Sequence, residues 1–147
     1  MMELIREQPF FKDIDESFLQ LFEGCASNQH FKEGQYLLRE GEESTHFFII
    51  RKGKVAIEIY AGNKGAIKIQ TLDPSDPLGW SWLFPPFRNQ FDALALRDTT
   101  VLAFAGDCLR KKIRSDSKFG YEMLLRLTNA IVERLGNTRL QLIDIYK

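Results

Sequence analysis

The sequence is poor in the residues that metal centres and disulfide scaffolds need. Among 147 residues it has two cysteines, Cys25 and Cys108, and two histidines, His30 and His46. Two cysteines are too few for a disulfide framework or a four-cysteine iron–sulfur cluster, and these two do not form a Cys-x-x-Cys pair. We therefore expect both cysteines to be buried, reduced thiols of an intracellular protein.

Net charge and long apolar runs are also missing. The formal net charge is +0, whereas a general nucleic-acid binder is usually basic. No apolar run approaches the ~18 residues that cross a bilayer, and residues 1–7 lack the apolar stretch of a signal peptide. We expect a cytoplasmic protein that binds neither membranes nor DNA directly. One basic cluster is predicted to be a solvated helix face, with a polyanion or partner contact as the alternative: Arg110, Lys111, Lys112, Arg114 and Lys118.

What the sequence does contain is a run of short strands followed by helices. After a short amphipathic helix around residues 18–22, apolar strands alternate with glycine turns. In Val55–Tyr60, apolar residues recur at every second position, as in a half-buried strand. We predict one mainly β domain, and strands at this spacing are typical of a sandwich, a barrel or a jelly roll. Its expected parts are an N-terminal helical segment at 1–27, the β-roll at 28–106 and C-terminal helices at 107–147.

The last predicted helix, residues 118–146, carries a heptad-like apolar seam. The seam residues are spaced 4-3-4-3-4-3: Leu124, Thr128, Ile131, Leu135, Thr138, Leu142 and Ile145. We interpret the seam as pairing with its copy in a homodimer, while Leu125, Val132 and Ile143 are free to face the roll. A helix folded back on its own domain is the alternative.

The segment Pro77–Asn89 is the strongest candidate site. Gly79 allows a close approach of backbone to a ligand. The N–H groups of the short helix that follows suit an anion, with Arg88 as a counter-charge. The same segment is rich in tryptophan, phenylalanine and proline, which is typical of a hydrophobic plug.

Four motifs carry a family resemblance over residues 28–145: Leu37–Glu42, Phe48–Val55, Asp76–Gly79 and Arg134–Leu135. With these motifs the chain resembles the cyclic-nucleotide-binding domain of the catabolite activator and Fnr family. The resemblance implies a mainly β fold of the double-stranded β-helix or jelly-roll type. It also implies a small-ligand sensor that dimerises through its long helix. That family often adds a helix-turn-helix, for which this chain leaves no room after residue 147, so we expect a stand-alone domain.

The cassette of this chain departs from the family pattern at two positions. In the family, the residue after the glycine is a glutamate that accepts the ribose 2′-OH, and here it is Trp80, which has only a donor N–H. The arginine that holds the cyclic phosphate aligns with Asn89, followed by Gln90, and Arg88 lies one residue early unless the loop differs in length.

By the same resemblance, the apolar walls of a ligand pocket fall on Leu38, Ile57, Ile69 and Leu72, interrupted by Gln70. Thr138 and Arg139 fall where the long helix closes over the base. The wall residues are equally compatible with a plain core in an empty roll. The full candidate ligand set comprises these seven residues together with Gly79, Trp80, Ser81, Trp82, Arg88, Asn89 and Gln90.

Two functions remain. Catalysis is not expected, because neither a Ser–His–Asp set nor a metal-ligand spacing is evident. The leading interpretation is a regulatory sensor with a degenerate cassette, with a cyclic nucleotide or another small anion as its possible ligand. The alternative is a dimeric scaffold, with a possible protein partner, whose pocket is filled by Trp80, Trp82 and Phe91.

Overall fold

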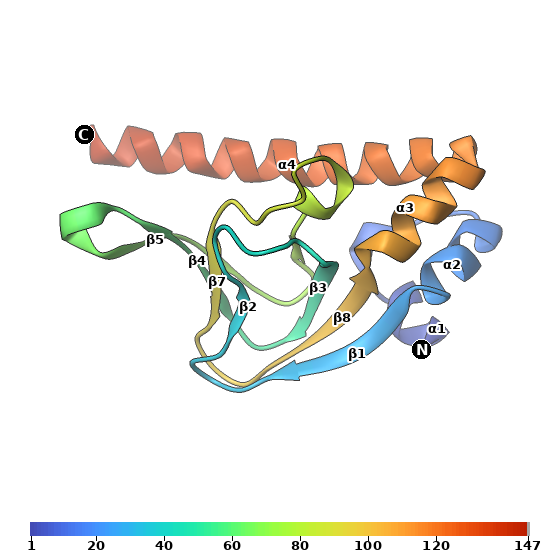
Figure 1. The fold of residues 1–147 in the computed structure, drawn as a ribbon, viewed down its shortest axis with the longest axis horizontal. Helices are drawn as coiled ribbons and strands as arrows, with labels where there is room; N and C mark the ends of the chain where they lie inside the picture. Colours follow the sequence, from blue (N-terminus) through green and yellow to red (C-terminus); the bar gives the residue numbers. More distant parts are fainter. Residues whose placement is uncertain (147) are drawn as a thin grey trace.

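The computed structural model describes residues 1–146, a β-roll with helices at both ends of the chain (Figure 1). The N-terminal elements are α1 (Met2–Arg6), the 3₁₀ helix η1 (Pro9–Phe11) and α2 (Glu16–Glu23). The strands and short turns are β1 (Ala26–Phe31), β2 (Tyr36–Leu38), β3 (His46–Lys52), β4 (Val55–Tyr60), η2 (Gly62–Lys64), β5 (Ala66–Leu72), β6 (Pro77–Leu78), η3 (Ser81–Leu83), β7 (Asp92–Ala95) and β8 (Thr99–Ala105). The chain ends in α3 (Gly106–Ser115) and α4 (Ser117–Ile145). Lys147, the end of the predicted segment 107–147, lies outside the described residues.

Two antiparallel sheets form the roll. Sheet A has the strand order β1-β8-β3-β6, and sheet B has the order β2-β7-β4-β5. In sheet A, Ile49 of β3 pairs with Leu102 of β8, and in sheet B, Ala56 of β4 pairs with Leu94 of β7. The predicted mainly β jelly roll with N-terminal, cassette and long C-terminal helices is confirmed.

The central strands of sheet A, β3 and β8, are buried on both faces, because their residues alternate between two cores. The first, the helical core, lies against the N-terminal helices, α3 and α4. It comprises Ile5, Phe11, Leu19, Phe22, Cys25, Phe47, Ile49, Trp82, Leu102, Phe104, Leu109, Phe119, Met123 and Leu127. The second, the roll core, lies between the two sheets. It comprises Leu37, Leu38, Phe48, Ile50, Val55, Ile57, Leu72, Leu78, Ala93, Ala95, Val101 and Ala103.

The β4–β5 hairpin leaves the body of the roll (Figure 1). This corrects the expected alternation in β4. Val55, Ala56 and Ile57 are all buried, whereas Ile59 is 40% exposed. The first half of β4 lies between β7 and β5, but Ile59 pairs with Ile67 of β5 alone. A two-stranded extension has no sheet to pack against, so position along the strand decides burial here.

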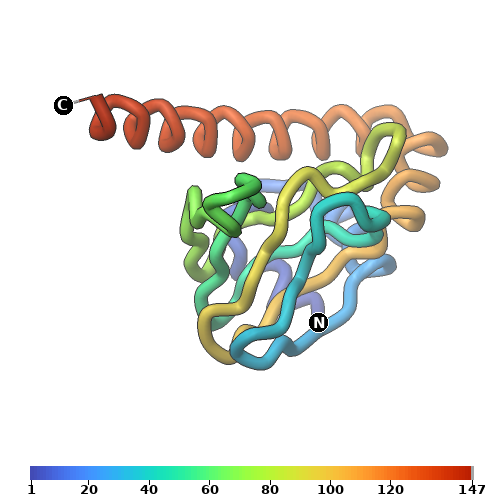
Figure 2. Tube along the Cα trace, turned by 60° about the vertical axis from the view of Figure 1, so that its left-hand side comes forward, coloured from blue at the N-terminus to red at the C-terminus, as the bar shows by residue number. Residues whose placement is uncertain are grey.

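Helix α4 crosses the roll and continues beyond it (Figures 1 and 2). Its buried residues are Phe119, Gly120, Met123 and Leu127, all in its first half. The suggestion that Leu125, Val132 and Ile143 face the roll is wrong, since they are 49%, 59% and 55% exposed. The side chains that meet the body of the domain lie on a different stripe of the helix, because Phe119, Met123 and Leu127 pack into the helical core.

The basic cluster on α3 is only partly a solvated face. Lys111, Arg114 and Lys118 are exposed. In contrast, Arg110 donates to the Trp82 carbonyl at 2.5 Å, and Lys112 donates to the Leu21 carbonyl at 2.8 Å. Two of the five cations therefore hold α3 to its neighbours, because the roll and α2 present backbone carbonyls that the sequence pattern does not reveal.

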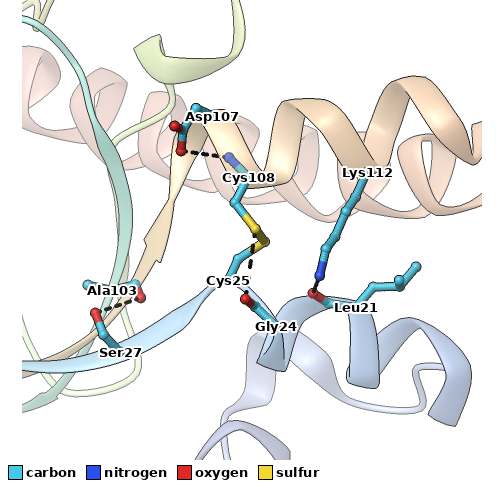
Figure 3. The surroundings of a disulfide bond; sticks show 8 residues. All are labelled: Leu21, Gly24, Cys25, Ser27, Ala103, Asp107, Cys108 and Lys112. Atoms are coloured by element: carbon cyan, nitrogen blue, oxygen red, sulfur yellow. Dashed lines mark hydrogen bonds between the residues drawn. A yellow bond between two sulfur atoms is a disulfide. The ribbon is translucent and has the colours of Figure 1, made fainter.

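The expectation of two reduced thiols is wrong, because Cys25 and Cys108 form a disulfide (Figure 3). Cys25 follows the last turn of α2, and Cys108 lies in the first turn of α3. The Ala105 N–H donates to the Cys25 carbonyl at 3.0 Å, which brings the two segments together and places the Cα atoms 5.7 Å apart. Since disulfides persist mainly in oxidising environments, the cysteines no longer support the cytoplasmic expectation.

Candidate functional site: the cassette between the roll and the long helix

The cassette begins where β6 ends. Gly79 has a φ of +88°, a conformation that suits glycine, and a Cβ there would lie 3.0 Å from the His46 carbonyl oxygen. Gly79 is thus needed for the turn and for close contact with β3. The predicted helical turn follows as the 3₁₀ turn Ser81–Leu83. Ser81 is buried at its start.

Trp82 is a core residue. Its side chain is fully buried in the helical core, 6.3 Å from the ring of Phe47, and its indole N–H donates to the Gly79 carbonyl at 3.0 Å. This hydrogen bond satisfies the buried indole donor, as buried tryptophans require. Trp82 therefore clamps the cassette turn onto sheet A from the side opposite to the roll interior.

Trp80 lies at the junction of the roll and α4. Its ring packs 6.4 Å from Phe91, which contacts the roll core, and the Arg134 guanidinium lies 4.9 Å above it. Arg134 also donates to the Pro77 carbonyl. Burial lowers the pKa of Arg134 to about 10, while the charge of Asp76 acts to raise it. The position expected to hold a ribose-binding glutamate therefore holds a tryptophan that stacks under a cation.

One nitrogen of Arg134 is buried without a hydrogen-bond partner among residues 1–146, namely Nη1. Arg134 also lines a cavity of about 250 Å³ between α4 and the β5–β6 region. An unpaired buried guanidinium N–H is costly, so an acceptor in this cavity would be favoured.

Asn89, at the position expected for the phosphate arginine, is engaged by the protein itself. Its amide donates to the Arg39 carbonyl at 3.1 Å, and its backbone N–H donates to the Glu42 carbonyl at 2.9 Å. Asn89 is buried, whereas its neighbours Arg88 and Gln90 are exposed. Asn89 thus closes the loop after β2 onto the cassette, and the Arg88 side chain is solvent-accessible.

The predicted wall residues are split between two environments. Leu38, Ile57 and Leu72 belong to the roll core. Ile69 is 38% exposed on the protruding hairpin, and Gln70 beside it lines the cavity below α4. The structure therefore brings three of the walls together in the roll and places the other two at its rim.

Thr138 and Arg139 lie on the exposed part of α4. The Thr138 hydroxyl donates to the Arg134 carbonyl at 3.0 Å, one turn back in the same helix. Neither residue lies in the cluster formed by Trp80, Phe91 and Arg134. Because Arg134 and Thr138 are four residues apart, they share one face of the helix.

Two residues beside the cassette were not singled out as site residues by sequence reasoning. Arg110 holds the Trp82 carbonyl, and its guanidinium lies 4.5 Å above the Phe87 ring. Arg134 was noted only as part of a motif. Both are arginines on helices, and spacing alone does not distinguish them from surface cations.

His46, the first residue of β3, lies beside the cassette and near the start of α3. Burial lowers the pKa of His46, and the charge of Asp107 opposes that shift. The Thr45 Oγ1 atom lies 2.9 Å from the Nδ1 atom of His46.

Within residues 1–146, His, Cys, Asp and Glu form no group of three or more able to hold a metal ion. In the same span, every helix is too short or too polar to cross a membrane.

The fold and the cassette together define a β-roll binding domain closed by a C-terminal helix. The sequence matches the family described as "Cyclic nucleotide-binding domain" over residues 28–116. The chain belongs to this family.

Solved structures share the whole architecture. A cyclic nucleotide-binding domain from Methylobacillus flagellatus is 17% identical, with a TM-score of 0.81, over 97% of this chain and 80% of that chain. The N-terminal domain of a transcriptional regulator from Streptomyces coelicolor is 21% identical, with a TM-score of 0.68, over 95% of this chain and 94% of that chain. At these identities the likeness concerns the fold.

Curated relatives match over a shorter region. Human cGMP-dependent protein kinase 2 is 32% identical over 76 residues, which are 51% of this chain and 10% of the kinase. The chain thus corresponds to a small part of that relative.

Proposed function

We propose that this domain is a regulatory binding module for a small anionic ligand of the cyclic-nucleotide class, with weakened recognition of ribose and phosphate. Membership of the cyclic nucleotide-binding domain family supports the general class of ligand. The weakening is inferred from the cassette, which keeps the Gly79 turn but holds Trp80 and Asn89 where the family resemblance leads us to expect a carboxylate and an arginine.

The packing of Trp80 is the observation that carries this proposal. Its ring lies between Arg134 and Phe91, so it covers the approach from α4 to the roll core. An indole offers one donor and no strong acceptor. A ribose hydroxyl placed there lacks an acceptor, and at this position Arg134 meets an aromatic ring instead of a carboxylate.

The expected affinity follows from these losses. A buried hydroxyl without a partner costs about 1–3 kcal/mol. Loss of a charge-assisted contact to phosphate costs a similar amount, about 1.5–3 kcal/mol. Because about 1.4 kcal/mol corresponds to tenfold in affinity, cyclic AMP is expected to bind at least tenfold to a hundredfold more weakly than at a complete micromolar site.

Calorimetry with cyclic AMP and cyclic GMP on the wild type and on Trp80→Glu tests this. The new carboxylate lies next to Arg134 and offers an acceptor to ribose, so affinity should rise by tenfold or more. Phe84→Glu is the matched control, because Phe84 is exposed on the same loop. It adds the same charge outside the cluster and should leave affinity unchanged.

Two results contradict the proposal. In the first, the wild type binds cyclic AMP with micromolar affinity and Arg88→Ala does not. Arg88 would then be the phosphate ligand, and the cassette would be complete. Equal affinities of the wild type and Trp80→Glu for both nucleotides remove Trp80 as the cause of weak binding.

We also propose that the domain forms a homodimer through α4. The exposed seam supports this, since Leu124, Leu135 and Leu142 lie on one stripe of the helix and are 45%, 47% and 50% exposed. Apolar residues at a and d positions favour helix pairing. The pairing would place two rolls side by side and couple ligand binding in one copy to the position of the shared helices.

Sedimentation of Leu135→Glu tests the dimer. A charge in the paired seam lacks a partner, so association should weaken by several kcal/mol, at least ~3. The control is Leu140→Glu, since Leu140 is exposed on the opposite stripe and should still permit the dimer. Equal masses for the wild type and Leu135→Glu would refute pairing through this seam.

A further inference from the structure

The disulfide ties the N-terminal helices to α3 at one point. Cys25 is the first residue after Gly24, which caps α2, and Cys108 is the third residue of α3. Figure 3 shows the bond spanning the gap between the two helices, with Lys112 one turn further along α3. Nearby, Lys112 Nζ donates to the Leu21 carbonyl at 2.8 Å. The bond and this hydrogen bond hold the same face of α3 to α2.

The opposite side of α3 holds the cassette. Arg110, two residues after Cys108, donates to the Trp82 carbonyl at 2.5 Å and lies above the Phe87 ring. At the start of α3, a Cβ on Gly106 would come within 2.7 Å of Trp82 Cβ. Helix α3 is therefore in direct contact with both ends of the segment from Trp82 to Phe87.

α3 is also joined closely to α4. Asp116 alone separates the two helices, and its carboxylate caps α4. A Cβ on Gly120 would come within 2.9 Å of Ile113 Cγ2, so the helices meet closely at this point. Helix α3 is thus in contact with both the cassette and the first turns of α4.

The two sulfur atoms differ in their surroundings. Cys25 is buried, with 7% of its surface exposed, whereas Cys108 is partly exposed. Cys108 lies in the first turn of α3, and Lys112 follows one turn later. Helix N-termini and nearby cations stabilise a thiolate. The Gly24 carbonyl oxygen lies 3.8 Å from Cys108 Sγ. Cys108 therefore has the features of the attacking thiol, and Cys25 those of the resolving thiol.

We propose that Cys25–Cys108 is a reversible redox site that controls how firmly α3 holds the cassette. A thiolate of a dithiol reductant attacks Cys108 Sγ, the Cys25–Cys108 bond breaks, and Cys25 leaves as a thiolate that takes up a proton. The second thiol of the reductant then releases Cys108 and closes its own disulfide. Two electrons pass to the protein in this direction. Oxidation by a disulfide such as oxidised glutathione runs the same exchange in reverse.

Reduction leaves α3 attached by weaker contacts. Leu109 remains fully buried in the helical core, and the Lys112 hydrogen bond and the pairing of β1 with β8 remain. The fold is therefore retained, while α3 gains freedom next to Arg110. The expected result is a looser cassette in the reduced protein and a tighter one in the oxidised protein, whether or not a nucleotide binds.

Alkylation and hydrogen exchange test the proposal. When each form is denatured before alkylation, protein treated with oxidised glutathione should take up no iodoacetamide, and protein treated with dithiothreitol should take up two. Hydrogen exchange followed by mass spectrometry should be several-fold faster in residues 80–88 and 106–115 of the reduced protein. Residues 55–72, on the protruding hairpin, should exchange equally in both forms. Fresh oxidised glutathione should restore the slow exchange.

Two variants separate coupling from a general loss of stability. The double variant Cys25→Ala/Cys108→Ala should exchange at the same rate with and without dithiothreitol. In Arg110→Met the redox effect should persist in residues 106–115 and shrink in residues 80–88, because Arg110 links them. Thiols that stay alkylatable after oxidised glutathione, equal exchange of residues 80–88 in both forms, or faster exchange over the whole chain would each overturn the proposal.

Discussion

The two halves of α4 have the same secondary structure and different surroundings. The packed half, residues 117–131, contains every buried residue of the helix, including Phe119 and Met123. In the free half, residues 132–145, most side chains are exposed, and Leu135 and Leu142 are among them. Arg134, at the start of this half, still contacts Trp80 and Pro77. Figure 2 shows the free half extending past the roll. One helix thus combines a structural anchor with a surface available to a partner.

The length of α4 explains why its two halves differ in burial. At about 1.5 Å per residue, the 29 residues of α4 span ~43 Å, which is longer than a small roll is wide. The packed half is stabilised by the helical core. The free half adds turns to a helix that is already nucleated, and adding turns is far easier than starting a helix.

The largest contrast is expected between apolar truncations in the two halves. Phe119 is fully buried, and its ring lies 4.8 Å from that of Phe22. Phe119→Ala should lower the free energy of unfolding by about 3–5 kcal/mol, as truncation of a core phenylalanine does. Leu140→Ala, at an exposed position away from the seam, should change it by less than about 0.5 kcal/mol. Urea denaturation measures both, and similar losses in the two variants would refute the division of α4.

Arg126 in the packed half and Arg139 in the free half should also differ. Arg126 donates to the carbonyls of Phe10 and Lys12, at 2.5 and 3.0 Å, and to Glu122 at 2.9 Å. Arg126→Ala should therefore cost about 1.5–3 kcal/mol, the range for hydrogen bonds of charged groups. Arg139→Ala, in the exposed half, should cost less than about 0.5 kcal/mol. A loss in Arg126→Ala no greater than in Arg139→Ala would mean that α4 is not anchored to residues 10–12.

Glycine-to-alanine changes should have opposite signs in the two halves. An added Cβ has no neighbour within 4 Å at Gly136, whereas at Gly120 it comes within 2.9 Å of Ile113 Cγ2. Gly136→Ala should stabilise the helix by about 1 kcal/mol. Gly120→Ala should destabilise the protein, because overpacking costs about 1–3 kcal/mol and exceeds the gain in helix propensity. Thermal melts of the two variants should shift in opposite directions, and stabilisation by both would show that α3 and α4 are not tightly packed at Ile113.

Much of the fold was predictable from the sequence. The strand at Val55–Tyr60 matches the predicted range, and the long helix, predicted at 118–146, differs by one residue at each end. These elements carry strong local information: apolar residues at a constant period, and glycine turns between them. Strands β1 and β6 lack such patterns, because their place depends on pairing with β8 and β3.

The candidate site was predictable only as a region. The sequence located the cassette at Gly79 and showed that Trp80 and Asn89 depart from the expected carboxylate and arginine. It did not indicate that Arg134 lies above Trp80, since these residues are far apart in the chain. Nor did it indicate that the Asn89 amide is held by Arg39, because a side chain–backbone hydrogen bond leaves no spacing pattern.

Local chemistry and periodicity by themselves determined the class of fold, the order of its parts and the apolar seam of the long helix. Tertiary structure alone decided which stripe of that helix is buried, which cations are structural and that Cys25 meets Cys108. Burial and covalent pairing depend on segments brought together from 83 residues apart. Such proximity follows from the packing of the whole chain, and no local sequence pattern encodes it.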